Sequence, residues 1–104
     1  MSFLVRYSAQ AREDLKRLYS HLIERAETVD DLELAERACE AIVSAVEHNL
    51  SRWPFIYRKA DSSPFLRELL IPFGGAGYVA LFEIEDASTV TLLAVRHQLE
   101  DDYH

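Results

Sequence analysis

The sequence contains little that would build a disulfide-bonded or membrane-spanning protein. One of its 104 residues is a cysteine, so no disulfide can form within the chain. Because small secreted domains usually depend on several disulfides, the composition favours a reducing compartment, with Cys39 as a small packing residue of a helix. No apolar run approaches the roughly 18 residues of a membrane span, and the first residues lack the pattern of a signal peptide. We therefore expect a cytoplasmic protein that makes no membrane contact.

Glycine and proline are also scarce, with three of each, which excludes a fibrous or low-complexity chain. Hydrophobic residues make up 49% and charged residues 28%, the balance of an ordinary globular domain. A chain of this length can bury about 65% of its unfolded surface, enough for one core without a structural metal. We expect a single domain over residues 1–104, with no internal repeat and no linker.

Basic side chains are in deficit, with 11 Lys and Arg against 18 Asp and Glu and a net charge of -7. This charge repels nucleic acid, so direct sequence-specific nucleic-acid binding is not expected. The deficit is uneven along the chain. Residues 53–82 carry three basic and two acidic side chains, whereas residues 83–104 carry one and six. The middle third is therefore where an acidic partner would dock.

The first half of the chain predicts one strand and two helices. Residues 3–7 are β-prone and end at Ser8, a favourable helix N-cap. Apolar residues at three- and four-residue steps then predict amphipathic helices over residues 9–26 and 30–50. Asp30 precedes a glutamate by three residues, the spacing of a capping box, so we expect the second helix to begin there. Small alanines between the helices favour an antiparallel hairpin.

The second half predicts a sheet. Three β-rich runs span residues 65–71, 78–84 and 89–96. Short turns at 74–77 and 85–88 make them an antiparallel meander, and the glycines of the first turn fit a hairpin rather than a phosphate loop, because a strand follows. Residues 51–64 read as a loop with an aromatic anchor. The order β-α-α-β-β-β predicts an α+β fold in which a helical hairpin packs on a small, mainly antiparallel sheet.

Few residues suggest metal or nucleophile chemistry. His97, Glu100, Asp101 and His104 are of metal-ligand type, but a solvated acidic tail explains them better. No serine or cysteine lies beside a histidine in a nucleophile motif. We therefore expect neither a metal nor a cofactor.

One set of polar residues could meet at a rim of the sheet. It comprises Arg67, Tyr78, Arg96, His97 and Tyr103. A guanidinium, an imidazole and a phenol together can orient a ribose hydroxyl, stabilise a pentacoordinate phosphate and protonate a leaving oxygen. The same set can equally form a protein-binding edge. Because Arg96 and His97 are successive strand positions, only one of them can share a face with Arg67.

Four short motifs occur in a characteristic order. They are a Ser-x-x-Ala-x-x-Asp-Leu pattern within Val5 to Leu15, Arg67-Glu68-Leu69, the strand 78–84, and a final stretch from Leu92 through His97 to Asp101-Asp102-Tyr103. In this order and spacing they resemble the RelE/ParE superfamily of toxins over essentially the whole chain. The ParE branch, also called plasmid stabilisation proteins, is the most similar.

The resemblance implies the toxin of a type II toxin-antitoxin system. ParE-type members inhibit DNA gyrase, and the corresponding target-binding residues here would be Val95, Arg96, His97 and Tyr103. RelE-type members share the fold but are ribosome-dependent endoribonucleases that cut mRNA. We favour a gyrase inhibitor that acts by binding, with the mRNA endoribonuclease as the alternative and a toxin fold that has lost its activity as a third possibility.

The enzyme alternative has a specific residue set. By the resemblance, Arg67 matches the arginine of the second strand, His97 fills the position of the acid and Tyr103 that of the terminal tyrosine, with Arg96 beside them. Val79 stands where an arginine is common, and the basic approach expected for RNA is reduced to Arg58 and Lys59. These departures and the net charge weaken the nuclease interpretation.

The resemblance also implies a cognate antitoxin whose C-terminal segment wraps the toxin through apolar contacts. Because this chain is acidic, we expect a mainly apolar interface with charge contacts at basic positions. The expected antitoxin-binding residues are Trp53, Phe55, Tyr57, Arg58 and Arg67. Trp53 could instead cover the core beneath its loop.

Overall fold

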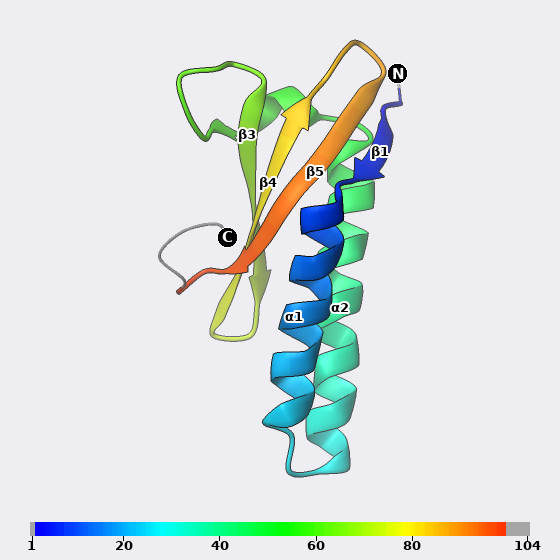
Figure 1. The fold of residues 1–104 in the computed structure, drawn as a ribbon, viewed down its shortest axis with the longest axis vertical. Coiled ribbons are helices and arrows are strands. Elements are labelled where there is room, and N and C mark those ends of the chain that lie inside the picture. Colours follow the sequence, from blue (N-terminus) through cyan, green and yellow to red (C-terminus); the bar gives the residue numbers. More distant parts are fainter. Residues whose placement is uncertain (1, 100–104) are drawn as a thin grey trace.

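The computed structural model describes residues 2–99, which form a five-stranded sheet covered on one face by two helices (Figure 1). The elements are β1 (Leu4–Tyr7), α1 (Ala9–Glu24), α2 (Val29–Leu50), a 3-10 turn η1 (Pro54–Ile56), β2 (Arg58–Lys59), β3 (Leu66–Phe73), β4 (Ala76–Ile84) and β5 (Thr89–His97). The predicted α+β fold with a helical hairpin on a mainly antiparallel sheet is confirmed. No helix in the described part is long and apolar enough to cross a membrane.

The strands lie in the order β1-β5-β4-β3-β2. β1 pairs in parallel with β5, with Leu4 opposite Thr89, and every other pair is antiparallel. The helical hairpin is therefore part of the crossover that carries the chain from β1 to the far side of the sheet. The parallel β1–β5 pair places the first strand and the last strand side by side, which sequence reasoning did not predict.

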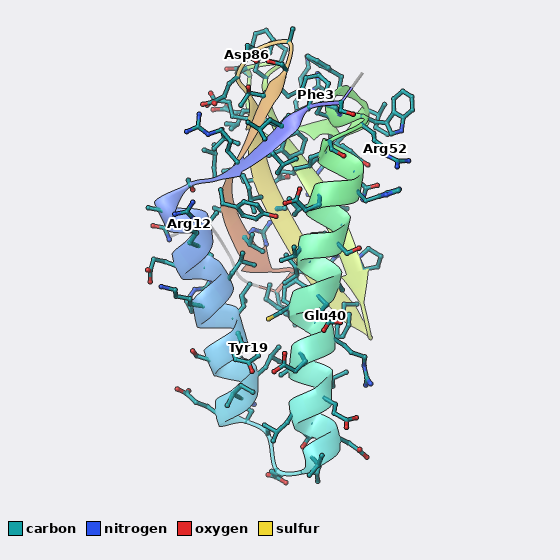
Figure 2. All side chains as sticks on the ribbon, turned by 90° about the vertical axis from the view of Figure 1, so that its right-hand side faces the viewer. Phe3, Arg12, Tyr19, Glu40, Arg52 and Asp86 are labelled. Atoms are coloured by element: carbon teal, nitrogen blue, oxygen red, sulfur yellow. The ribbon has the colours of Figure 1, made fainter. Side chains whose placement is uncertain are left out.

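α1 begins where its N-cap predicts. The Ser8 hydroxyl accepts a hydrogen bond from the Ala11 backbone N–H at 3.0 Å, which satisfies one of the free donors of the first turn. Across the hairpin, the Tyr19 hydroxyl donates to a Glu36 carboxylate oxygen at 2.7 Å (Figure 2). The helix ends at Glu24, two residues before the predicted end.

α2 begins one residue earlier than predicted and with a different capping box. The Thr28 hydroxyl accepts from the Asp31 N–H at 3.1 Å, and the Asp31 carboxylate accepts from the Thr28 N–H at 3.3 Å. A further bond from the Glu27 N–H, 2.9 Å long, is the main reason that the pKa of Asp31 is lowered. The prediction that Asp30 caps the helix is therefore wrong, because the threonine hydroxyl supplies the acceptor two residues earlier.

The β3–β4 hairpin is longer than predicted. β3 continues through Pro72, which is tolerated because β2 pairs only with Arg67 and Glu68 and leaves this part of β3 at the edge. The turn contains Gly74 at φ 62°, a left-handed conformation that favours glycine. Gly77 lies opposite Pro72, and a Cβ there would collide with the carbonyl of the neighbouring strand.

The core lies between the sheet and the helices. The largest fully buried side chains come from both layers and include Phe82, Leu92, Ile42, Val46 and Leu50. The turn between α1 and α2 reaches well beyond the β3–β4 turn, so the lower part of the hairpin extends past the sheet (Figure 1). Figure 2 shows the hairpin in front of the sheet from the helix side.

Candidate functional site

The outer edge of β5 lacks a partner strand over its last part, and α1 takes that place. The pairing of β1 with β5 stops at Leu92. One residue further on, the Ser8 hydroxyl donates to the Leu93 carbonyl at 2.9 Å, while the Ser8 N–H donates to the Leu92 carbonyl. A buried strand edge requires such partners, because an unpaired backbone group is costly away from water.

Asp14 completes this attachment. Asp14 as a whole is 2% exposed, and its Oδ2 accepts from the Val95 N–H at 2.9 Å. Its Oδ1 accepts from the Gln10 amide at 2.8 Å and lies 3.8 Å from the Arg17 guanidinium, which donates to the Val95 carbonyl at 3.3 Å. The Ser-x-x-Ala-x-x-Asp motif therefore docks α1 onto β5, a role that its spacing alone did not reveal.

A bulge in β5 sets the orientation of the strand's last residues. Leu81 of β4 pairs with Ala94 and Phe82 pairs with Leu92, so Leu93 is an extra residue. After the bulge, Val95 packs in the core at 1% exposure. The bulge therefore turns the side chain of Val95, one of the expected target-binding residues, toward the helices.

His97 and Tyr78 do come together, as cross-strand partners on the helix-bearing face. Their rings meet edge to face with centroids 5.5 Å apart. The Leu99 N–H donates to His97 Nδ1 at 3.2 Å, which fixes the orientation of the ring. Burial raises the pKa of the Tyr78 phenol, which therefore stays protonated at neutral pH. The pair presents a fixed imidazole and a buried phenol.

Arg67 lies elsewhere and has a structural role. Its guanidinium donates to the carbonyls of Pro64, Phe55 and Tyr57 at 2.8, 3.1 and 2.7 Å. It also lies over the Phe55 ring at 5.6 Å from the centroid. These contacts hold the segment around η1 against the end of β3.

The predicted convergence of Arg67 with Arg96 and His97 does not occur. Arg67 lies opposite Phe82 and His97 opposite Tyr78, four positions apart on β4, which is roughly 13 Å along the strand. Arg96 lies opposite Val79 on the other face, where its guanidinium donates to the carbonyls of His97 and Gln98 at 3.4 and 3.5 Å. These residues lie apart because of the register of the strands, that is, which residues lie opposite one another. The pattern of residue types in the sequence does not determine this register.

The remaining predicted site residues fall outside the description. Tyr103 lies beyond residues 2–99, as do Glu100, Asp101 and His104. Within residues 2–99 there is no group of three or more His, Cys, Asp or Glu that could hold a metal ion.

The predicted antitoxin-binding residues divide into exposed and supporting ones. Trp53 is 62% exposed and Phe55 49%, whereas Pro54 between them is buried. The alternative that Trp53 covers the core is therefore wrong. Tyr57 packs edge to face on the buried Phe82 ring at 6.2 Å, and burial raises its pKa.

Two further apolar side chains, which sequence reasoning missed as surface residues, extend this exposed group. Ile56 is 70% exposed and Phe65 49%. Together with Trp53 and Phe55 they form what we call the aromatic patch. Arg58 lies nearby on β2, where its guanidinium holds the Glu68 carboxylate through two nitrogens at 3.0 and 2.9 Å. An aromatic group of this kind is typical of a protein-binding surface.

The fold and these surfaces define a small α+β protein whose helical hairpin is anchored to the last strand of the sheet and which exposes several apolar side chains around η1. A sequence model of the family described as "ParE toxin of type II toxin-antitoxin system, parDE" matches residues 5–102, and the chain belongs to this family. It is thus a ParE toxin of a type II toxin-antitoxin system.

A solved structure agrees with this assignment at the level of the fold. A chain described as "Chromosomal ParDE TA system from P. aeruginosa" superposes with a TM-score of 0.70 at 18% sequence identity, covering 92% of this chain and 96% of that chain. A comparison with proteins of curated function gave no significant match.

Proposed function

We propose that this toxin inhibits DNA gyrase by binding to it in the cytoplasm, and that an antitoxin encoded beside it neutralises it. Binding is favoured over mRNA cleavage by one observation. The guanidinium of Arg67, the arginine that a nuclease would need, is committed to three backbone carbonyls and lies far from His97. Family membership and the net charge of -7 support the same choice.

The proposed target surface is the end of β5 and the segment that follows. Arg96 and His97 are both partly exposed there, on opposite faces of the strand, and we include Tyr103 from the sequence. Val95 contributes indirectly, because its backbone N–H and carbonyl are held by α1.

The proposed antitoxin surface includes the aromatic patch. Trp53 and Phe55 would be the apolar anchors, and Arg58 would supply a charge contact at the rim. Tyr57 and Arg67 would contribute indirectly, because they hold the η1 segment in place.

The test is a supercoiling and cleavage-complex assay with purified gyrase. The full chain is added alone and then with the protein encoded by the adjacent reading frame. We expect inhibition that the second protein reverses, and we expect Arg96→Ala to weaken it while Arg12→Ala, on an exposed face of α1, does not. Unimpaired supercoiling at a stoichiometric excess of toxin would refute the proposal. Translation-dependent mRNA cleavage that is lost in His97→Ala would establish the nuclease instead.

A further inference from the structure

A groove of about 410 Å³ lies between the segment around η1 and the β4–β5 turn. Asp86 of this turn lies at the end of the molecule away from the tip of the helical hairpin (Figure 2). The residues that line the groove are Phe55, Phe65, Ile84, Glu85, Asp86 and Ala87. Its volume falls within the range of pockets that bind small ligands. Neither of its carboxylates belongs to the proposed target surface or to the aromatic patch.

Hydrogen bonds hold the walls of the groove in place. The Phe65 carbonyl accepts from the Ile84 N–H at 2.8 Å, which fixes the residue before β3 against the end of β4. In the β4–β5 turn, the Asp86 carboxylate accepts from the Ser88 N–H at 2.8 Å and from the Ser88 hydroxyl at 3.1 Å. The η1 side is held by the guanidinium of Arg67. The groove is therefore formed before a partner arrives, which lowers the entropic cost of binding.

The apolar part of the groove includes two aromatic side chains that are half exposed. Phe55 and Phe65 are each 49% exposed, whereas Ile84, which also lines the groove, is buried. Phenylalanine gains free energy when it is removed from water, so an apolar group that packs on these rings is favoured. The face of an aromatic ring also attracts a cation, and the Arg67 guanidinium already lies 5.6 Å from the centre of the Phe55 ring. The rings suit an aliphatic chain that ends in a positive charge.

The polar part of the groove is acidic. It consists of Glu85 and Asp86, and no Lys, Arg or His is among the described residues that line it. Hydrogen bonds from the backbone and hydroxyl of Ser88 lower the pKa of Asp86, so its carboxylate is ionised at neutral pH. Glu83, two residues before Glu85, adds a third carboxylate at the same end of β4. A positively charged partner group is therefore favoured there.

We propose that this groove binds a basic segment of the toxin's target, which is gyrase under the proposed function on which this step rests. An arginine or lysine of that segment would lay its aliphatic stem on the two phenylalanine rings and direct its charged end to Glu85 and Asp86. The occupant is chosen by charge complementarity. It is not the antitoxin, whose charge contacts are expected at basic positions such as Arg58. Phe55 and Phe65 also belong to the aromatic patch, so an antitoxin bound there would cover the groove and exclude the target segment.

The groove and the proposed target surface lie at opposite ends of β5. Thr89 begins this strand just after the turn that carries Asp86, and His97 ends it about 27 Å further along. A target that reaches both places gains from two linked contacts. Loss of one contact should therefore weaken inhibition without abolishing it.

The first experiment uses a peptide probe and does not depend on the identity of the target. The full chain, labelled with nitrogen-15, is titrated with acetyl-Leu-Arg-Leu-amide and with the same peptide carrying uncharged citrulline in place of arginine, while amide chemical shifts are recorded. We expect shifts at Phe65, Glu85 and Asp86, and binding of the citrulline peptide that is about fivefold weaker at about 0.1 M salt. Equal binding of the two peptides, or shifts only at residues outside the groove, would overturn the proposal.

The second experiment measures inhibition of gyrase supercoiling by the double variant Glu85→Gln/Asp86→Asn. Asparagine keeps a side-chain oxygen that can accept from Ser88, so the turn is preserved. The matched control Glu24→Gln/Glu27→Gln changes the net charge equally on exposed residues that do not line the groove. We expect the groove variant to need about tenfold more protein for half-inhibition and the control to stay within about twofold of wild type.

A third variant, Ala87→Arg, adds a cation to the rim of the groove at an exposed residue. It should weaken gyrase inhibition to a similar extent with an unchanged melting temperature, whereas Ser20→Arg, on an exposed position of α1, should not. If the groove variants instead lose affinity for the antitoxin or lose self-association, with gyrase inhibition intact, the proposal is overturned in favour of the antitoxin or of a second copy of this chain.

The two experiments separate this proposal from the proposed function. If the wild-type chain leaves gyrase active but its groove binds the arginine peptide selectively, the proposed function fails and the groove for a basic segment stands. If gyrase is inhibited equally by wild type and by the groove variants, the groove proposal fails and the proposed function stands.

Discussion

The attachment of α1 to β5 predicts a large effect from one substitution, Asp14→Ala. Asp14 is 2% exposed, and its carboxylate accepts a hydrogen bond from the Val95 N–H at 2.9 Å. Alanine leaves that N–H buried without an acceptor. The other two contacts, Gln10 and Arg17, are made by exposed residues, and the Arg17 side chain is 47% exposed, so water can solvate the amide and the guanidinium once the carboxylate is gone.

The expected loss of stability can be calculated from the buried Val95 N–H that loses its acceptor and from the Arg17 guanidinium that water can still solvate. A hydrogen bond to a charged group contributes about 1.5–3 kcal/mol, and an orphaned buried donor adds about 1–3 kcal/mol. Alanine has the higher helix propensity, which returns about 0.5 kcal/mol. We therefore expect a net loss of about 2–5 kcal/mol, which lowers the melting temperature of a domain of this size by roughly 10–30 °C.

Urea unfolding followed by circular dichroism measures this loss. Asp14→Asn keeps an acceptor oxygen but loses the charge, so it should cost about 1–2 kcal/mol, roughly half the loss in the alanine variant. Glu13→Ala is the control, because that carboxylate is 68% exposed and paired only with Lys16 at 3.6 Å, and it should change stability by less than about 0.5 kcal/mol. Equal losses for the alanine and asparagine variants, or an alanine variant within about 0.5 kcal/mol of wild type, would refute the role of the carboxylate as an acceptor.

Three further predictions concern other parts of the fold. Arg67→Lys cannot span three carbonyls, so we expect a loss of about 1–2 kcal/mol in urea unfolding and faster proteolysis within residues 53–64, with gyrase inhibition by the folded protein retained. Burial and the hydrogen bond to Glu47 raise the pKa of Tyr7 above its unfolded value of about 10. The neutral phenol therefore stabilises the fold below that pH. The free energy of unfolding should fall more steeply between about pH 9 and pH 11.5 in wild type than in Tyr7→Phe, and parallel curves of this free energy against pH would contradict the prediction. Trp53→Ala should change the free energy of unfolding by less than about 0.5 kcal/mol but weaken antitoxin binding, measured by calorimetry, at least tenfold. Unchanged affinity would show that the aromatic patch is not part of the antitoxin interface.

Local signals in the sequence predicted both helices, the strands β1, β3, β4 and β5, and their order along the chain, but not β2 or η1. The two helices were found from their periodicity, and Ser8 caps α1 as expected. The capping box of α2 was misplaced, because Thr28 and Asp31 carry the same spacing as Asp30 and Glu33 and only the structure shows which pair is used. Local spacing therefore identifies a helix start to within two residues.

The site was less predictable because it depends on register and on long-range contacts. Arg67 resembled a catalytic arginine in sequence, but its partners are carbonyls up to 12 residues away in a loop whose 3-10 turn and two-residue strand gave no periodic signal. The bulge at Leu93 likewise has no marker such as glycine, so the inward direction of Val95 was missed.

The bulge and the α1 attachment together connect the stability of the fold to the orientation of the proposed target residues. Leu92 faces the core, so strict alternation would turn His97 to the open face and Arg96 toward the helices. The extra residue at Leu93 reverses this, and the Val95 backbone is then fixed by Asp14 two residues before His97. The imidazole consequently meets the Tyr78 ring on the helix-bearing face, while the guanidinium of Arg96 lies on the other face. The motif that carries the family resemblance in α1 thus fixes the position of His97, and through it the geometry of the proposed target surface.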